Sequence, residues 1–380
     1  MKVALLTATL SPAAGGLATS VPATAAALAE LPGCEVHIVG TEDTAAPEAW
    51  RTWGRHVHSH RTYGPAAFKF APSIGRTLRD LGADVTDVQG LWVHSSLAHL
   101  GYQRSRGRPY LITPRGMLDP WALKRSWWKK RAAAWWFEDA HLHGAMCLRA
   151  TAIMEAHHFR SYGLRQPIAI VPNGVDLPAL MSRTNAGDRR KRLLFLSRIH
   201  PKKGIPFLLR AWAALHRRHP DWELVIAGPE EIGHQRAMQV LAKELALPRV
   251  MWPGPAHGQE KDALYRSADL FVLPTHAENF GLVIAEALSY RIPVITTTNA
   301  PWAGVHEHDC GWWIDLADGP LIETLHLALG LQDATRTSMG ARGRAWMERD
   351  FAWAAVGRQM LEVYHWAAAG GARPSCVLVD

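Results

Sequence analysis

The chain has 380 residues, of which 48% are hydrophobic and 20% are charged, and its formal net charge is +8. Such a composition excludes a disordered or fibrous chain, and the length favours two domains over one. The excess of cations indicates an anionic partner, which can be nucleic acid, acidic lipid headgroups or a phosphorylated small molecule.

Strand-like and helix-like segments alternate through the first half of the chain. Residues 2–8 (KVALLTA) predict a strand, 11–16 (SPAAGG) a turn, and the alanine-rich segment 17–31 a helix. Further strands are predicted at CEVHIVG, ADVTDVQG, RPYLITP, ATAIM and IAIVPNG, which occupy 34–40, 83–90, 108–114, 150–154 and 168–174. Helix-length sequence separates these strands, and this pattern is typical of parallel βαβ units.

The alternation stops in a polar segment, LPALMSRTNAGDRRKR (177–192), which has no apolar period. We place a linker there, at 179–191, between domains at 1–178 and 192–350. Strands are predicted again at LLFLSR, WELVIAG, RVMWPG, DLFVLPT and IPVITT (193–198, 222–228, 249–254, 269–275 and 292–297), and 351–380 should form a helix that crosses back to the first domain. The sequence therefore predicts an α/β protein with two Rossmann-like, doubly wound domains facing a cleft, with ligands at the carboxyl ends of the strands.

One loop of the second domain is rich in cations. In LFLSRIHPKKG (194–204) a predicted strand is followed at once by Arg198, Lys202 and Lys203. Cations at the carboxyl end of a parallel strand project into the ligand crevice, where arginine and lysine match phosphate oxygens. The alternative is that these loop cations are simply solvated.

A second loop, HAENFGLVIAE (276–286), places Glu278 before a predicted helix and Glu286 within it. We expect this helix to run from Gly281 to Tyr290 with Asn279 as its N-cap, and the N–H groups at a helix start favour phosphate. The two carboxylates would then suit a ligand with hydroxyl groups at both ends and phosphates between them. The alternative is a capping glutamate followed by an exposed helix glutamate.

Taken together, SRIHPKKG (197–204), AGP after WELVI, ADLFVLPTHAENFGLVIAEAL (268–288) and IPVITT resemble the donor domain of the retaining glycosyltransferases of family 4, which have the GT-B fold. The glycine-rich turn after the first strand and IVPNGVD (170–176) extend the resemblance to the first domain, which is then the acceptor side. PRGMLDPWAL, APWAGV with CGWWID, and FAWAAVGRQMLEVYHW are similar to the branch that assembles bacterial exopolysaccharide and lipopolysaccharide chains.

The resemblance implies roles for individual residues. Arg198 and Lys203 match the cations that neutralise the nucleotide diphosphate, Glu286 matches the carboxylate that binds the ribose, and Glu278 matches the one that contacts the donor sugar. We therefore interpret Arg198, Lys203 and Glu278 as catalytic. The other donor-binding candidates are the backbone of Asn279, Phe280 and Gly281, together with Gly15 and Gly16, which form either a turn that approaches the diphosphate or an ordinary tight turn.

Several positions depart from the family pattern. Arg115, in YLITPRG, stands where many relatives have a histidine, as do Asp87 and Gln89, and Arg291 replaces a small residue. Arg115 is a further donor-binding candidate, since it can contact donor phosphate or an acidic acceptor, but it stays protonated and cannot act as a general base. The departures at Arg115, Asp87 and Gln89 concern the acceptor chemistry and not donor binding.

The implied function is that of a retaining hexosyltransferase in cell-surface polysaccharide assembly. The donor would be a nucleotide diphosphate sugar, GDP-mannose as first choice and UDP-glucose as second, and the acceptor a glycan or a polyprenyl-diphosphate-linked oligosaccharide. Two cations and a helix start can stabilise the leaving diphosphate without a metal, so no cofactor is expected.

Three other classes of protein are the alternatives: a GT-B-fold epimerase or phosphorylase, a catalytically silent sugar-nucleotide sensor, and a nucleic-acid-binding protein. A phosphorylase of the pyridoxal type requires a cofactor lysine in a much longer chain. A nucleic-acid-binding protein would not need two glutamates beside Arg198 and Lys203, so we expect no nucleic-acid partner.

The segment WALKRSWWKKRAAAWWFE (121–138) predicts one helix with a face of Trp128, Ala132, Trp135 and Trp136. The flanking cations are Lys124, Arg125, Lys129, Lys130 and Arg131. Tryptophan beside cations suits a helix that lies among anionic headgroups, which predicts docking at the inner face of the plasma membrane. The alternative is a core face with a solvated basic back.

Neither a signal peptide nor a membrane-spanning run of apolar residues is recognisable, so we expect a cytoplasmic protein. The four cysteines, Cys34, Cys147, Cys310 and Cys376, lack the spacing of a zinc site or the density of a disulfide scaffold. We therefore expect reduced thiols and no metal.

Overall fold

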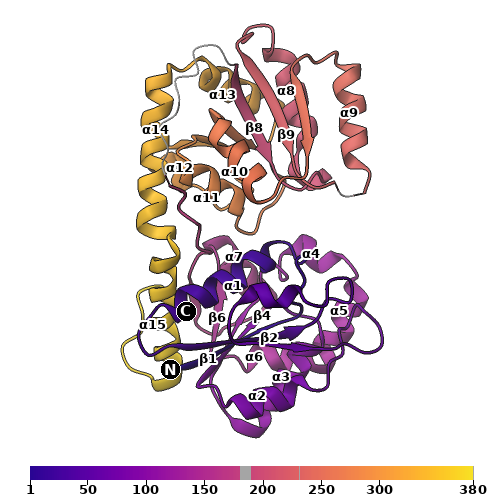
Figure 1. Ribbon diagram of the computed structural model, residues 1–380, viewed down its shortest axis with the longest axis vertical. Coiled ribbons are helices and arrows are strands. Elements are labelled where there is room, and N and C mark those ends of the chain that lie inside the picture. Colours follow the sequence, from indigo (N-terminus) through magenta and orange to yellow (C-terminus); the bar gives the residue numbers. More distant parts are fainter. Residues whose placement is uncertain (180–189, 231, 380) are drawn as a thin grey trace. The chain divides into compact units, whose positions relative to one another are not determined.

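The computed structural model describes residues 1–179, 190–230 and 232–379. The chain divides into two compact units, Met1–Gly174 with Trp353–Asp380, and Val175–Ala352 (Figure 1). Most of the predicted linker, at 180–189, lies outside the described residues.

The first unit is built on an eight-stranded sheet in the order β14-β7-β6-β5-β4-β1-β2-β3. Neighbouring strands are parallel except β14 and β7. Along β1 (Lys2–Thr7), Ala4 and Leu6 pack into one apolar cluster, while Val3 and Leu5 pack into the cluster on the other face, because successive side chains of a strand point to opposite sides. Both faces are therefore buried, as in doubly wound sheets. The other strands are β2 (Glu35–Thr41), β3 (Val57–His60), β4 (Val85–Gln89), β5 (Tyr110–Thr113), β6 (Cys147–Ala150), β7 (Ile168–Ile170) and β14 (Val377–Leu378).

Helices cover this sheet, and α2, α3 and α7 each end at a glycine in the left-handed conformation, which other residues adopt only at a cost. The C-terminal helix α15 (yellow in Figure 1) packs on α1, and the hydroxyl of Tyr364 donates to Asp87 of β4 at 2.7 Å. The α-helices of this unit are α1 (Gly16–Ala29), α2 (Ile74–Leu81), α3 (His94–Arg106), α4 (Pro120–Lys124), α5 (Trp127–Ala133), α6 (Asp139–His143), α7 (Ile153–Tyr162) and α15 (Trp353–Ala369).

The second unit has a six-stranded, fully parallel sheet in the order β10-β9-β8-β11-β12-β13. Its strands are β8 (Lys191–Leu196), β9 (Trp222–Ala227), β10 (Val250–Gly254), β11 (Leu270–Leu273), β12 (Val294–Thr297) and β13 (Gly311–Ile314). Its α-helices are α8 (Ile205–Leu215), α9 (His234–Glu244), α10 (Gly258–Ser267), α11 (Leu282–Ser289), α12 (Gly304–Glu307), α13 (Asp318–Gly330) and α14 (Asp333–Trp346). The predicted α/β class with two doubly wound sheets is confirmed.

One predicted strand is displaced, and three strands of the structure were not predicted. The strand predicted at 150–154 lies at 147–150 instead, and α7 begins at Ile153. Ile153 is 52% exposed, so a short apolar run here belongs to a helix start and not to the buried sheet. The strands β3, β13 and β14 were not predicted, because the first is histidine-rich, the second is half-buried and the third has two residues.

The segment 121–138 is not one helix. α4 ends at Lys124, Ser126 has a φ of +53°, and α5 is followed by a π-helical turn at Ala134–Glu138. The left-handed residue breaks the chain direction and the π turn changes the helical period. The predicted single helix therefore does not form, although Trp128, Trp135 and Trp136 lie in one helical stretch that runs from Trp127 to Glu138. Within the described ranges, no helix is both long and apolar enough to cross a membrane.

Candidate active site

Two neighbouring strands deliver the predicted donor-binding loops to one edge of the second sheet. β8 and β11 pair in parallel with Leu270 opposite Leu193, and all of β11 is buried. Their carboxyl ends therefore lie side by side, at the edge where open α/β sheets bind ligands. The loop 197–204 follows β8, and the loop 274–281 follows β11.

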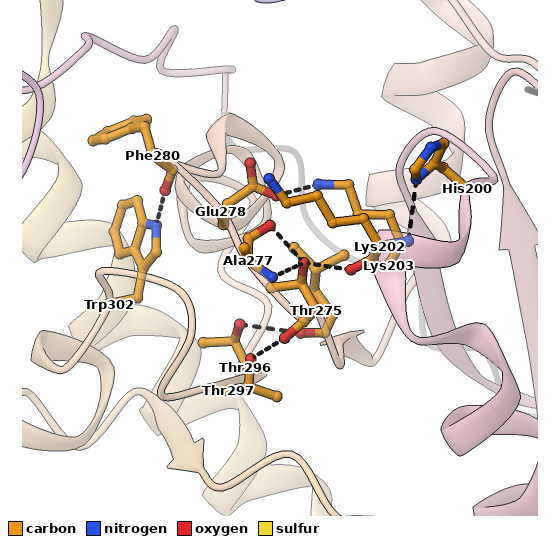
Figure 2. A network of polar contacts seen from close by, with 11 residues as sticks. His200, Lys202, Lys203, Thr275, Ala277, Glu278, Phe280, Thr296, Thr297 and Trp302 are labelled. Carbon is orange, nitrogen blue, oxygen red and sulfur yellow. Dashed lines mark hydrogen bonds and ion pairs between the residues drawn. The ribbon is translucent and has the colours of Figure 1, made fainter. Parts of the chain in front are cut away.

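Hydrogen bonds and close backbone packing join these two loops (Figure 2). The carbonyl of Lys202 accepts from the N–H of His276 at 2.8 Å and from the hydroxyl of Thr275 at 3.1 Å. Gly204 has a φ of +67°, and a Cβ at this position would lie 1.8 Å from the carbonyl oxygen of Pro274. Glycine is therefore required where the loops cross, and the two loops form one fixed element.

The loops bring Lys203 and Glu278 into contact. Lys203 is 4% exposed, and its ammonium forms an ion pair with Oε2 of Glu278 (Figure 2). The N–H of Glu278 donates to the carbonyl of Asn299 at 3.0 Å, which ties this loop to the one after β12. A buried ammonium is costly unless it is paired, so the carboxylate explains how a lysine fits here.

The two predicted cations of the loop 197–204 occupy different environments. Arg198 is exposed at the start of the loop, directly after the buried end of β8, whereas Lys203 is buried at its end. This loop therefore carries one positive charge at the protein surface, on Arg198, and one in a buried position, on Lys203. Their shared role at a diphosphate stays a prediction.

The helix α11 begins one residue later than predicted, and Asn279 is not its N-cap. The N-cap is Gly281, with a φ of +81°, and a Cβ there would lie 2.9 Å from Cγ of Glu278. The residue that turns the chain into this helix has to be glycine, both for its left-handed conformation and because the Glu278 side chain lies over the helix start. In the first turn the N–H of Ile284 donates to the carbonyl of Gly281 at 2.8 Å, whereas the N–H groups of Leu282 and Val283 come too early in the helix for a regular helical acceptor.

The segment before α11 is anchored from below by Trp302. Phe280 is buried, its ring lies 5.3 Å from that of Trp302, and the indole N–H of Trp302 donates to the carbonyl of Phe280 (Figure 2). These contacts fix the backbone of the segment that should meet the donor, a contact that stays a prediction. APWAGV (300–305) resembles a family segment, but no pattern in it indicates this contact of Trp302.

Glu286, on α11, is held by two side chains of α10. Lys261 Nζ lies 2.5 Å from its Oε1, and the hydroxyl of Tyr265 donates to its Oε2 at 2.7 Å. The Glu286 side chain is 19% exposed, so the alternative of an exposed helix glutamate is wrong. Burial raises the pKa of Tyr265, which keeps its hydroxyl a donor. The sequence offered one signal for Lys261 and Tyr265, the four-residue spacing that places them on one helix face.

Comparison with known proteins shows the family of the chain. A profile described as Glycosyl transferases group 1 matches residues 178–346, and one described as Glycosyl transferase 4-like domain matches residues 15–174. The chain belongs to the group 1 glycosyltransferases. The predicted family is thereby confirmed in both halves of the sequence.

Similar proteins agree with this glycosyltransferase family. The D-inositol 3-phosphate glycosyltransferase of Salinispora tropica is 33% identical over 225 residues, which cover 53% of this chain and 46% of that protein. The chain spans about half the length of the curated relatives it matches. Sucrose-phosphate synthase from Thermosynechococcus elongatus superimposes with a TM-score of 0.79 at 21% identity, over 98% of this chain and 100% of that one. HepE from Anabaena, in complex with UDP and glucose, gives a TM-score of 0.76 at 17% identity, over 96% and 99%. At these identities the structures establish the GT-B fold.

Gly15 and Gly16 belong to the first unit of this glycosyltransferase. Gly15 is the N-cap of α1 with a φ of +60°, and Gly16 is the first residue of that helix. No atom of the described residues lies within 4 Å of a Cβ placed at either position. The positive φ accounts for Gly15, and no contact with the described residues requires glycine at position 16. Their approach to a diphosphate stays a prediction.

Arg115 is held by polar partners in the first unit. Its Nε and Nη2 donate to Oε1 of Gln89 at 2.9 and 2.6 Å, and its Nη1 donates to Oδ1 of Asn173. Burial and the neighbouring Arg149 lower the pKa of Arg115 to about 9, which leaves it protonated at neutral pH. Gln89, one of the departures from the family pattern, therefore orients this guanidinium.

The seven predicted membrane-surface residues all lie on the surface of the first unit. Lys124 ends α4, Arg125 follows it, Trp128, Lys129 and Lys130 lie on α5, and Trp135 and Trp136 lie in the π-helical turn. All are exposed except Lys130, which is half-buried and donates to the carbonyl of Ala122. The alternative of a core face is therefore wrong. In the described part of the chain, no group of three histidine, cysteine, aspartate or glutamate side chains is placed to hold a metal ion.

Proposed function

We propose that this glycosyltransferase moves a hexose from a nucleotide diphosphate sugar, with retention of configuration, to a glycan or polyprenyl-diphosphate-linked acceptor in cell-surface polysaccharide assembly. GDP-mannose is the donor proposed first and UDP-glucose the second. The observation that carries the proposal is the ion pair of Lys203 and Glu278 at the carboxyl edge of the second sheet, where the loops after β8 and β11 are bonded together.

A cation and a carboxylate in contact suit the point where a sugar joins a phosphate. Lys203 offers N–H donors that phosphate oxygens accept, and Glu278 accepts hydrogen bonds from sugar hydroxyls. Because the two side chains touch each other, one ligand that binds both must place a phosphate and a sugar hydroxyl at adjoining positions. The bond between sugar and phosphate has this arrangement.

The chemical demand of the reaction is the negative charge that develops on the departing diphosphate. Arg198, Lys203 and the first-turn N–H groups of α11 supply fixed positive charge and donors for it. In the proposed reaction the bond from the anomeric carbon to the phosphate oxygen breaks while a bond to the acceptor oxygen forms on the same face. The acceptor proton passes to the departing phosphate. The proposal requires no metal and no further cofactor, because side chains provide the positive charge.

Glu286 is the proposed ribose ligand. Its two oxygens already accept from Lys261 and Tyr265, and each carboxylate oxygen can accept a second hydrogen bond. The two protein donors fix the orientation of the carboxylate before a ribose binds. Preorganisation of this kind reduces the entropy lost on binding. The UDP bound to HepE, which shares the fold, supports a nucleotide ligand for this chain.

A panel of GDP-, UDP- and ADP-sugars in a thermal-shift measurement tests the donor, because a ligand that binds only the folded state raises the melting temperature. We expect a clear rise with GDP-mannose and, failing that, with UDP-glucose. Absence of any rise at concentrations far above ordinary affinities would contradict the proposal. The donor that binds is then incubated with a lipid-linked glycan acceptor. Consumption without an acceptor, with a new sugar nucleotide as the product, would identify an epimerase instead.

A further inference from the structure

Five tryptophans of the first unit have half or more of their surface exposed. They are Trp121, Trp127, Trp128, Trp135 and Trp136, and Trp135 is 89% exposed. We call them the tryptophan patch. Single exposed apolar residues are ordinary, but a contiguous group of large ones marks an interaction surface. The transferase chemistry proposed above uses none of these residues.

The backbone beneath the patch is firmly anchored. Directly after the exposed Trp135 and Trp136, Phe137 is 1% exposed and Glu138 is fully buried. The Glu138 carboxylate accepts from the N–H of Trp92 at 2.5 Å. The π-helical turn thus turns two indoles outward from a fixed base. Extra-residue turns of this kind are frequent at functional sites.

A second segment, far away in sequence, enlarges the apolar surface. Phe68 stacks on Trp136 with ring centroids 6.4 Å apart. In the same loop, Tyr63 is 59% exposed and Phe70 is 40% exposed, and the N–H of Tyr63 donates to the carbonyl of Phe70 at 2.8 Å. The surface therefore comes from two separate segments that fold together, and it is not a single amphipathic helix.

The segment that carries the tryptophan patch is strongly basic. Residues 120–137 contain five lysines and arginines and no aspartate or glutamate. Lys124, Arg125, Lys129 and Arg131 are exposed, and the Lys129 ammonium lies 5.3 Å from the ring of Trp128. Exposed indoles and cations are therefore interleaved along one segment of the surface. This surface is complementary to a partner that is apolar beneath a layer of negative charge.

We infer that the tryptophan patch docks the enzyme on the surface of an anionic lipid bilayer. Indole rings are stable at the level of the headgroups, with their apolar body inward and the N–H toward water, and lysine and arginine pair with lipid phosphates. A second copy of this chain docked by the same segment would bring four exposed cations against four, which is repulsive. A protein interface has few charges at its core, whereas here cations lie between the indoles. This inference goes beyond the proposed transfer reaction, since it requires neither donor nor acceptor.

The test is sedimentation of the 380-residue chain with vesicles, without any nucleotide sugar. One set of vesicles is phosphatidylcholine, and the other is phosphatidylcholine and phosphatidylglycerol in equal parts. We expect binding to the anionic vesicles and much weaker binding to the neutral ones. Replacing Lys124, Lys129 and Arg131 by Gln should lower the partition coefficient about fivefold for each cation, or about a hundredfold together. Trp128→Ser with Trp135→Ser should lower binding to the anionic vesicles to a similar extent.

Matched controls change the same chemistry elsewhere. Arg104, Arg106 and Arg108, exposed at and beyond the end of α3, are replaced by Gln in one control, and Leu327, 56% exposed on α13, by Ser in another. Both controls should bind as the unaltered chain does. The three-Gln variant alters no apolar side chain, so it tests the idea even where the serine variant unfolds.

Several results would overturn the inference. Patch variants that bind anionic vesicles normally would show that the patch is not the docking surface. An equal loss in the Arg104, Arg106 and Arg108 control would show that only net charge matters. Binding of single-stranded RNA without vesicle binding, or a dimer that the tryptophan variant abolishes, would assign the surface to another partner.

Discussion

The ion pair of Lys203 and Glu278 allows the structural role of these residues to be separated from their proposed role in transfer. Lys203→Met leaves a carboxylate that keeps 17% of its surface exposed, and Glu278→Gln leaves an ammonium whose side chain is 6% exposed. Breaking a buried pair costs about 3–5 kcal/mol. Water reaches the carboxylate more easily, so we expect about 2 kcal/mol for Lys203→Met and about 3 kcal/mol for Glu278→Gln. The double variant leaves no charge unpaired and should cost about 1 kcal/mol.

Differential scanning calorimetry measures these costs. For a unit the size of the second, each kcal/mol lowers the melting temperature by about 2–4 °C, so the double variant should melt higher than either single variant. Donor binding, in contrast, should stay lost in the double variant, because both side chains are gone. The control is a more exposed ion pair of the same unit, formed by Arg210 and Asp318. The variant Arg210→Met with Asp318→Asn should change the free energy of unfolding by less than about 1 kcal/mol and leave donor binding intact.

Two outcomes would refute this reasoning. If the loss of stability in the double variant equals the sum of the single losses, the two side chains are not coupled. If the double variant binds the donor as the unaltered chain does, the pair is structural only. The two outcomes are distinguishable, because the coupling of the side chains is measured by the melting temperature and the role in donor binding by ligand titration.

Three further predictions follow from single contacts. Tyr265→Phe should weaken nucleoside diphosphate binding about tenfold, because one hydrogen bond to the Glu286 carboxylate is lost; calorimetric titration measures the affinity. The control is Tyr290→Phe, at the tyrosine that stacks on Tyr265. An equal loss of affinity in the control would contradict the role of Tyr265 at Glu286. Gly281→Ala should abolish transfer. The control is Gly233→Ala, because Gly233 is also an N-cap with positive φ but has no atom of the described residues within 4 Å of a Cβ placed there; this variant should lose only about 1 kcal/mol of stability through strain. Normal transfer by Gly281→Ala would contradict the prediction. Burial raises the pKa of Glu138 from 4.5 to about 7, so the stability that the protonated carboxyl contributes is present below pH 4.5 and is lost as pH rises through 7. Urea unfolding across this range should show the fall in the free energy of unfolding. Glu138→Gln should remove this pH dependence.

The sequence predicted the second unit well because its functional residues follow regular strand–loop–helix signals. β11 and residues 193–196 of β8 are continuous apolar runs, and each is followed by its polar loop, so Lys203 and Glu278 could be placed at the carboxyl edge. Their direct contact was not predictable, because it depends on β8 and β11 being neighbours in the sheet. The partners of Glu286 were missed for a similar reason, since α10 approaches α11 only in the folded unit.

The errors arose where tertiary structure or a special backbone conformation outweighs local preference. Asparagine is a good N-cap by statistics, but the close approach of the Glu278 side chain and the positive φ at the helix start require glycine, and Gly281 takes the position. In 121–138 a helical period was assumed throughout, while Ser126 adopts the left-handed conformation. The π turn at Ala134–Glu138 coincides with the burial of Phe137 and Glu138, and no periodicity in the sequence indicates it.

The proposed function requires that the loop of Arg198 and Lys203 binds the diphosphate of a nucleotide sugar. The most direct test of this requirement is calorimetric titration of GDP and UDP into three proteins. These are the unaltered chain, the variant Arg198→Ala with Lys203→Met, and a control in which the exposed Arg217 and Arg218 are replaced by Ala. Loss of two charge-assisted contacts should weaken binding at least about a hundredfold, and the control, with the same change of charge, should bind normally. Equal affinity in all three proteins would contradict the account.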